Sequence, residues 1–292
     1  MTEPVRYIDR TRAYYLALGY DAPYVWAENS DIPFTPLQKP LAETKVALVT
    51  TAALFDSEKG DQGPSAAYNG GAKFFTPYQA PVENPPKTGI SHIAYDRKHT
   101  AATDERAWLP LNTLKQAAVD GVIGDVAKHF HGLPTNRSQR TTIEEDAVLL
   151  LAALKQDQAE VAILVPNCPV CHQSVTLAAR HLEENGIPTV VMGCAKDIVE
   201  SAGAPRFVFS DFPLGNGAGK PHDEISQRDT LALALTLLEK AKSPETVINP
   251  QVWSNDHSWK DDYSNPEKLS AKELAERRAA FDAEKQAAKT VR

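Results

Sequence analysis

Short apolar runs that alternate with helical segments constrain the fold of this 292-residue chain more than any other feature. EVAILVP (160–166), PTVVM (188–192) and PRFVF (205–209) have the length and composition of strands buried on both faces, and KVALVTT (45–51) starts the same alternation. Helices are predicted over 172–185, 196–201 and 225–240. The pattern predicts an α/β fold, with a doubly wound, mostly parallel sheet and helices on both faces, as in flavodoxin-like or Rossmann-like proteins.

The remaining segments predict the domain organisation. An aromatic and proline-rich arm (1–44) carries a helix over 11–18, and its apolar side chains should pack on the parent domain or on a second subunit. A catalytic α/β domain follows (45–250), divisible into halves 45–135 and 136–250, and a polar tail (251–292) carries a helix over 272–289. Within the domain we expect strands at 89–95 and 127–133, a helix over 111–120, and a helix from an N-cap at Thr141 or Thr142 to about residue 156.

Charge and hydropathy exclude several classes of function. The net charge is −7 and the pI is about 5.7, which disfavours a nucleic-acid binder. No apolar run approaches the roughly 18 to 20 residues of a membrane helix, and the N-terminus lacks a secretory pattern. We therefore expect a cytoplasmic protein that does not bind membranes. We also expect a homo-oligomer, most simply a dimer.

The motif Cys168-Pro169-Val170-Cys171 follows a predicted strand and opens a predicted helix. Unpaired N–H groups and the helix dipole favour a thiolate at this position, and a second thiol three residues on can close a disulfide. Redox chemistry is the leading hypothesis, with Cys168 attacking and Cys171 resolving.

A metal site is the main alternative, because Cys168 and Cys171 could ligate zinc with Cys194 or a nearby histidine. The sequence has no second CxxC and no HxxxH to complete such a set. The CxxCH pattern that ends at His172 also matches covalent haem attachment, which belongs to exported chains and is discounted here.

Proton donors and a substrate loop are predicted from other polar segments. Asp96 and His99 form one candidate acid–base pair, and His129, His131 and His172 are further candidates. A Gly-rich loop after a predicted strand could bind an anionic part of a substrate through Gly215, Gly217, Gly219 and Lys220. It matches neither nucleotide-binding Gly motif, so no nucleotide is expected.

Several motifs together resemble the selenoprotein B family, which includes the B components of glycine, sarcosine and betaine reductases and a D-proline reductase subunit. They are SHIAYDRKHT, LPLNTLKQAAVDGVIGDVA, EVAILVPNCPVC, GIPTVVM and PRFVFSDFPLGNGAGKP, within residues 45–240. The resemblance implies reductive cleavage of a carbon–heteroatom bond, usually C–N, by a selenolate whose adduct a thiol resolves. Here the matching motif carries Cys168 and Cys171 and no selenocysteine, as in a selenium-free member.

Together these features predict a thiol-dependent oxidoreductase acting on a small, anionic or amino-acid-like substrate. Its electrons would come from an external thiol or a thioredoxin-like donor. A Cys/His metalloenzyme and a non-catalytic subunit of a multicomponent reductase are the alternatives. No specific cofactor is predicted beyond this donor, and a metal ion is the other candidate.

Overall fold

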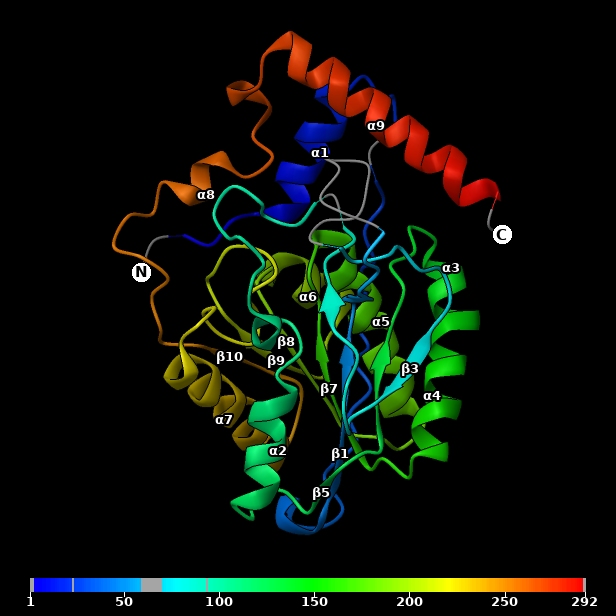
Figure 1. Cartoon of the computed structure of the whole chain (residues 1–292), viewed down its shortest axis with the longest axis vertical. Helices are drawn as coiled ribbons and strands as arrows, with labels where there is room; N and C mark the ends of the chain where they lie inside the picture. Colours follow the sequence, from blue (N-terminus) through cyan, green and yellow to red (C-terminus); the bar gives the residue numbers. More distant parts are fainter. Residues whose placement is uncertain (1–2, 23, 59–69, 93, 291–292) are drawn as a thin grey trace.

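The computed structural model describes residues 3–22, 24–58, 70–92 and 94–290, and within them the chain folds around one central sheet (Figure 1). The order of its strands is β10-β9-β8-β7-β1-β6-β3, with β5 also paired to β1. Every pair in this sheet is parallel except β3 with β6. The strands are β1 (Lys45–Thr50), β3 (Tyr78–Pro81), β5 (Asp125–Val126), β6 (His129–Gly132), β7 (Val161–Val165), β8 (Thr189–Gly193), β9 (Arg206–Phe209) and β10 (Glu245–Ile248).

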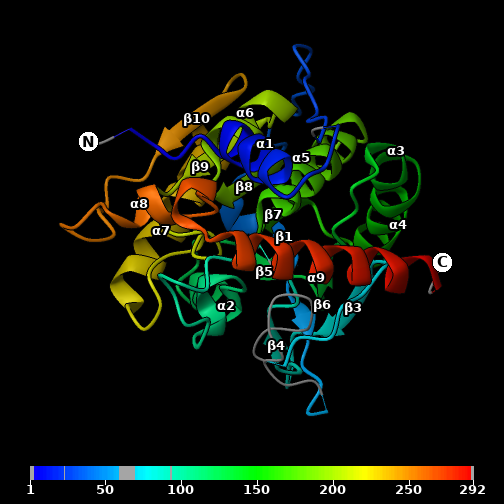
Figure 2. The same cartoon turned by 90° about the horizontal axis from the view of Figure 1, so that it is seen from above.

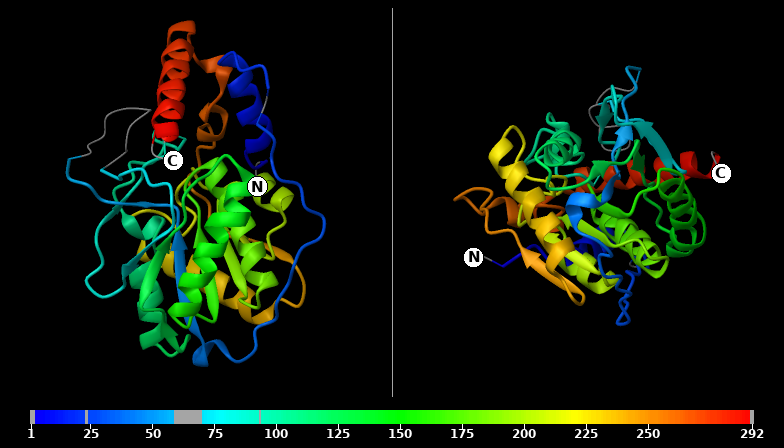
Figure 3. Two further views of the ribbon diagram at one scale, coloured as in Figure 1. Left: turned by 90° about the vertical axis from the view of Figure 1, so that its right-hand side faces the viewer. Right: turned by 90° about the horizontal axis from the view of Figure 1, so that it is seen from below.

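Helices cover both faces of the sheet, which confirms the predicted doubly wound α/β class (Figure 3). Successive side chains of β1 point to opposite faces, so that Val46 and Leu48 pack with α2 (Leu111–Val119) and α7 (Glu224–Lys240). Ala47 and Val49 pack on the other side, with α4 (Ala147–Gln156), α5 (Pro169–Glu184) and α6 (Lys196–Ala202). Each buried Val or Leu side chain stabilises this core by about 1.5–3 kcal/mol.

The terminal segments lie together above the carboxyl ends of the strands (Figures 1 and 2). They contain α1 (Tyr7–Ala17), α8 (Trp259–Asp262) and α9 (Ala271–Thr290). The rings of Tyr7 and Tyr263 pack edge to face with their centroids 5.3 Å apart, and those of Tyr14 and Phe281 do so with centroids 6.3 Å apart. No helix in the described part of the chain is long and apolar enough to cross a membrane.

Three predictions of local structure were wrong. The strand expected at 89–95 is only the short β4 (Thr88–Gly89), which pairs with β2 (Ala53–Leu54) outside the main sheet, and residue 93 lies outside the described residues. Ser138, not Thr141 or Thr142, caps the helical segment before α4, because its Oγ accepts the N–H of Thr141. The helix expected from residue 172 begins at Pro169, because Pro is favoured in the first turn of a helix.

The remaining elements are short and connect the larger ones. They are η1 (Leu41–Glu43), η2 (Glu105–Ala107), α3 (Gln139–Thr141), the π-helical turn η3 (Thr142–Asp146) and η4 (Pro266–Lys268).

Candidate functional site

The chain reverses its winding direction between β1 and β7, and this point defines the candidate site. From β1 the chain crosses through α2 to β6 on one side, whereas from β7 it crosses through α5 to β8 on the other. Ligands of open α/β sheets bind at such switch points, outside the carboxyl ends of the strands. Here Thr51 follows β1 and its Oγ1 accepts the N–H of Asn167, which precedes Cys168, at 3.0 Å.

The CxxC motif forms the first turn of α5. Cys168 is the N-cap, and its Sγ accepts the N–H of Cys171 at 3.3 Å. Pro169 at the first helical position has no N–H to satisfy and a φ suited to the helix. Both sulfur atoms therefore lie at the positive end of a 16-residue helix, and both side chains are buried free thiols.

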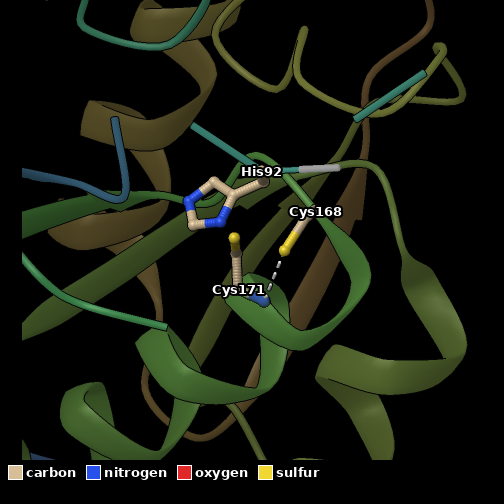
Figure 4. A group of neighbouring side chains, drawn as sticks. All are labelled: His92, Cys168 and Cys171. Atoms are coloured by element: carbon tan, nitrogen blue, oxygen red, sulfur yellow. Dashed lines mark hydrogen bonds between the residues drawn. The ribbon is translucent and has the colours of Figure 1, made fainter. Parts of the chain in front are cut away.

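His92 completes this cluster, although its sequence pattern alone did not mark it as a site residue. Its ring nitrogen and the sulfur atoms of Cys168 and Cys171 all lie within 4.8 Å of one another (Figure 4). The other ring nitrogen, Nε2, lies 2.8 Å from the carbonyl oxygen of Thr51. The sequence offered one indication of His92: it is the second residue of SHIAYDRKHT, a stretch rich in polar side chains.

The electrostatics of the cluster favour a thiolate at Cys171. Burial raises the pKa of this thiol, but hydrogen bonding to Cys168, the charge and hydrogen bond of His92 and the hydroxyl of Thr135 together hold it well below its ordinary value. Thr135 Oγ1 lies 3.1 Å from Cys171 Sγ. Burial lowers the pKa of His92, but the Cys171 thiolate and the Thr51 carbonyl raise it above its ordinary value.

The same three side chains could hold a soft metal ion, since two thiolates and one imidazole are ligands that zinc accepts. Cys194, the third cysteine predicted as a ligand, does not belong to this cluster of His92, Cys168 and Cys171. Burial raises the pKa of the Cys194 thiol to about 12, and the N–H groups of Asn216, Gly215 and Phe212 offset only part of this.

His172 joins the CxxC turn to the turn after β8. Its Nδ1 donates to the carbonyl of Cys168 at 2.7 Å, and its Nε2 accepts the N–H of Cys194 at 2.9 Å. The accepting Nε2 requires the neutral ring, and burial lowers the pKa of His172 to about 4. This geometry favours a positioning role over the proton transfer predicted for His172.

Asp96 and His99 pair as predicted from their spacing, with His99 Nδ1 2.8 Å from Asp96 Oδ1. Burial raises the pKa of Asp96, against the lowering effect of His99. Burial raises the pKa of Tyr263, and the charges of Cys168 and Asp96 raise it further. The role of the Asp96–His99 pair in proton transfer stays a prediction.

His129 and His131 lie on β6 and interact with Asp157, at the amino end of the sheet where α4 leads into β7. His129 Nδ1 is 2.8 Å and His131 Nε2 is 3.2 Å from the carboxylate. Burial lowers the pKa of His131 to about 4, although Asp157 opposes the shift. The structure does not bring this pair to the thiols.

Close packing accounts for the glycines of the loop after β9. A Cβ at Gly215 would overlap the ring of Tyr95, and one at Gly217 would overlap the backbone of Met192. The N–H groups of Gly219 and Lys220 donate to Asn216 O and Ser226 Oγ. These bonds occupy two of the backbone N–H groups that the loop could offer to an anion. Its predicted role in substrate binding therefore depends on the other N–H groups of the loop and on the Lys220 side chain.

The neutral state of His172 predicts a loss of stability in mild acid. Because the folded-state pKa of about 4 lies below the unfolded value of about 6.5, the unfolded chain takes up the proton first as the pH falls. Stability contributed by this group is full above about pH 6.5 and is lost toward pH 4, by about 3 kcal/mol at most. Denaturant unfolding at several pH values in this window should show a shallower slope in His172→Gln, and an unchanged slope would contradict the assignment.

Comparison with known proteins supports the relationship that the motifs predicted. The chain is 26% identical over 216 residues to the D-proline reductase subunit gamma of Acetoanaerobium sticklandii, covering 74% of this chain and 86% of that protein. It is 24% identical over 234 residues to the glycine reductase complex component B subunit gamma of Symbiobacterium thermophilum, and 23% identical over 220 residues to the sarcosine reductase complex component B subunit beta of Peptoclostridium acidaminophilum. These matches cover 78% and 74% of this chain.

The match spans 54% and 50% of the glycine and sarcosine reductase proteins, so this chain corresponds to about half of their length. No family model matches the chain. No solved structure matches it either. This chain is therefore related to the D-proline, glycine and sarcosine reductase subunits, with 23–26% identity over most of its length.

Proposed function

We propose that the chain is a thiol-dependent reductase that cleaves a carbon–heteroatom bond, such as C–N, in a small, anionic or amino-acid-like substrate. The observation that carries this proposal is the convergence of Cys168, Cys171 and His92 at the switch point of the sheet. The names of the relatives support reduction of amino-acid-like molecules, since they are subunits of D-proline, glycine and sarcosine reductases.

The two cysteines supply two electrons and two protons in this scheme. Cys168 sulfur attacks the substrate carbon, so that a C–S bond forms, the C–X bond breaks, and X leaves with the proton that Cys168 gives up. The Asp96–His99 pair is the candidate carrier of this proton. Cys171 sulfur then attacks Cys168 sulfur, the disulfide forms, the C–S bond breaks, and the carbon takes the second proton. An external thiol or thioredoxin-like donor then reduces the disulfide.

A supporting role in a larger assembly is the second candidate. The relatives are named as subunits and complex components, so the chain could bind partner subunits, or form a homodimer, and depend on another subunit for turnover. Reduction of D-proline, glycine or sarcosine only when a co-purified subunit is added would favour this candidate.

Thiol titration of the native protein, before and after mild reduction, tests the redox proposal, with metal analysis on the same sample. Because Cys168 and Cys171 cycle together, we expect two more reactive thiols after reduction of the oxidised protein and no bound metal. A Cys194→Ser variant should give the same increase. Stoichiometric metal with Cys168 and Cys171 protected from the reagent would overturn the redox mechanism.

A further inference from the structure

The hydrogen bonds of His92 fix which ring nitrogen faces the thiols. The carbonyl oxygen of Thr51 can only accept, so Nε2, 2.8 Å away, must carry a hydrogen. Figure 4 shows the other ring nitrogen, Nδ1, directed at the sulfur of Cys171. Nδ1 can therefore accept the thiol proton or, once protonated, donate it back. This is the arrangement of an activated nucleophile: a base beside the thiol, oriented by a third group.

We propose that His92 stores the proton of Cys171 at Nδ1 and delivers it to the substrate carbon when Cys171 resolves the adduct. This inference rests on the proposed function. In the resting state His92 is an imidazolium, Cys171 is a thiolate, and Cys168 keeps its own proton. When the thiolate attacks Cys168 sulfur, the C–S bond breaks and its electron pair goes to carbon, which takes the His92 proton. The products are the disulfide, the reduced substrate and a neutral His92.

Charged and polar neighbours fit this role. Lys73 opposes protonation of His92, whereas the Cys171 thiolate and the Thr51 carbonyl favour it. Thr135 Oγ1 at 3.1 Å and the thiol of Cys168 add hydrogen bonds that favour the thiolate. The N-terminus of α5 adds its positive dipole at the same place. The ion pair of His92 and Cys171 therefore has stabilising partners on both sides.

The ultraviolet absorbance of thiolate, followed against pH in the reduced protein, tests the proposal without a substrate and without access to the buried sulfur atoms. We expect a thiolate band at neutral pH in the wild type that is absent in Cys171→Ser. In His92→Gln the thiol should regain an ordinary pKa of about 8.5, so that the thiolate population at pH 7 falls by roughly tenfold to thirtyfold. His129→Gln is the matched control, since His129 contacts Asp157 instead, and should keep the band.

A reciprocal measurement protects the test against misfolding of the His92 variant. In Cys171→Ser the imidazole loses its anionic partner, so its ring resonances in the nuclear magnetic resonance spectrum should titrate at lower pH than in the wild type. A full thiolate band in His92→Gln, an unshifted His92 titration in Cys171→Ser, or a band that chelation abolishes would each overturn the inference. Disulfide cycling of Cys168 and Cys171 in the wild type separates the two hypotheses. If any of these three results were found while the disulfide still cycles, the proposed function would stand without His92. Failure of disulfide cycling would remove the proposed function itself.

Discussion

Replacing Glu183 by alanine is expected to lower the free energy of unfolding by about 3 to 5 kcal/mol, the cost of leaving one charge of a buried ion pair alone. Glu183 lies on α5, and its Oε1 accepts from Arg206 Nη1 at 2.7 Å, with both side chains fully buried. Its carboxylate also accepts the N–H groups of Thr189 at 2.6 Å and Thr35 at 2.5 Å. One carboxylate therefore joins α5, β8, β9 and the N-terminal segment.

Neighbouring Glu184 provides a matched control, because it is exposed on the same helix. Glu184→Ala should change the free energy of unfolding by about 0.5 kcal/mol or less. Urea denaturation of both variants measures the difference. The double variant Glu183→Leu with Arg206→Met should recover much of the loss, since it leaves no unpaired charge. Equal stability of Glu183→Ala and Glu184→Ala would show that the ion pair contributes nothing.

The sequence predicted best those strands whose burial can be read from their own residues. The runs that became β1, β7, β8 and β9 were predictable because a strand buried on both faces must be apolar throughout. The edge strand β10 was missed, since ETVI is partly exposed and carries too little apolar signal. β3 was missed for a related reason: its sequence, YQAP, is half polar and includes proline.

The candidate site divides in the same way. The position of Cys168 and Cys171 at a strand-to-helix turn follows from local sequence, and the structure places the motif in the first turn of α5. His92 reaches Cys171 across 79 positions of the chain, and no local pattern reports such a contact. The predicted role of the glycine-rich loop in substrate binding stays a prediction, and the close approach of Gly215 to the ring of Tyr95 is a contact that the sequence does not display.

Cys168→Ser and Cys171→Ser should each abolish reduction of the oxidised protein by a thioredoxin system, whereas Cys194→Ser should not. Under the proposed function, mild oxidation closes one disulfide between Cys168 and Cys171, whose sulfur atoms lie within 4.8 Å of each other. Its reduction by NADPH, thioredoxin reductase and thioredoxin consumes one NADPH per chain, which absorbance measures directly. A serine hydroxyl cannot form the disulfide, so either single variant should fall to background, and any substrate turnover should fall by about 10³-fold or more.

Cys194 is the informative control for this prediction, because it is equally buried and follows the neighbouring strand β8. Burial raises the pKa of its thiol to about 12, so it carries almost no thiolate at neutral pH and should not react. NADPH consumption that survives in Cys168→Ser but disappears in Cys194→Ser would transfer the redox role to a different pair of thiols. Such a result would also separate the His92 cluster from electron transfer, since His92 lies with Cys168 and Cys171. Loss of NADPH consumption in the two CxxC variants alone would instead show that Cys168 and Cys171, in the first turn of α5, are the redox-active pair.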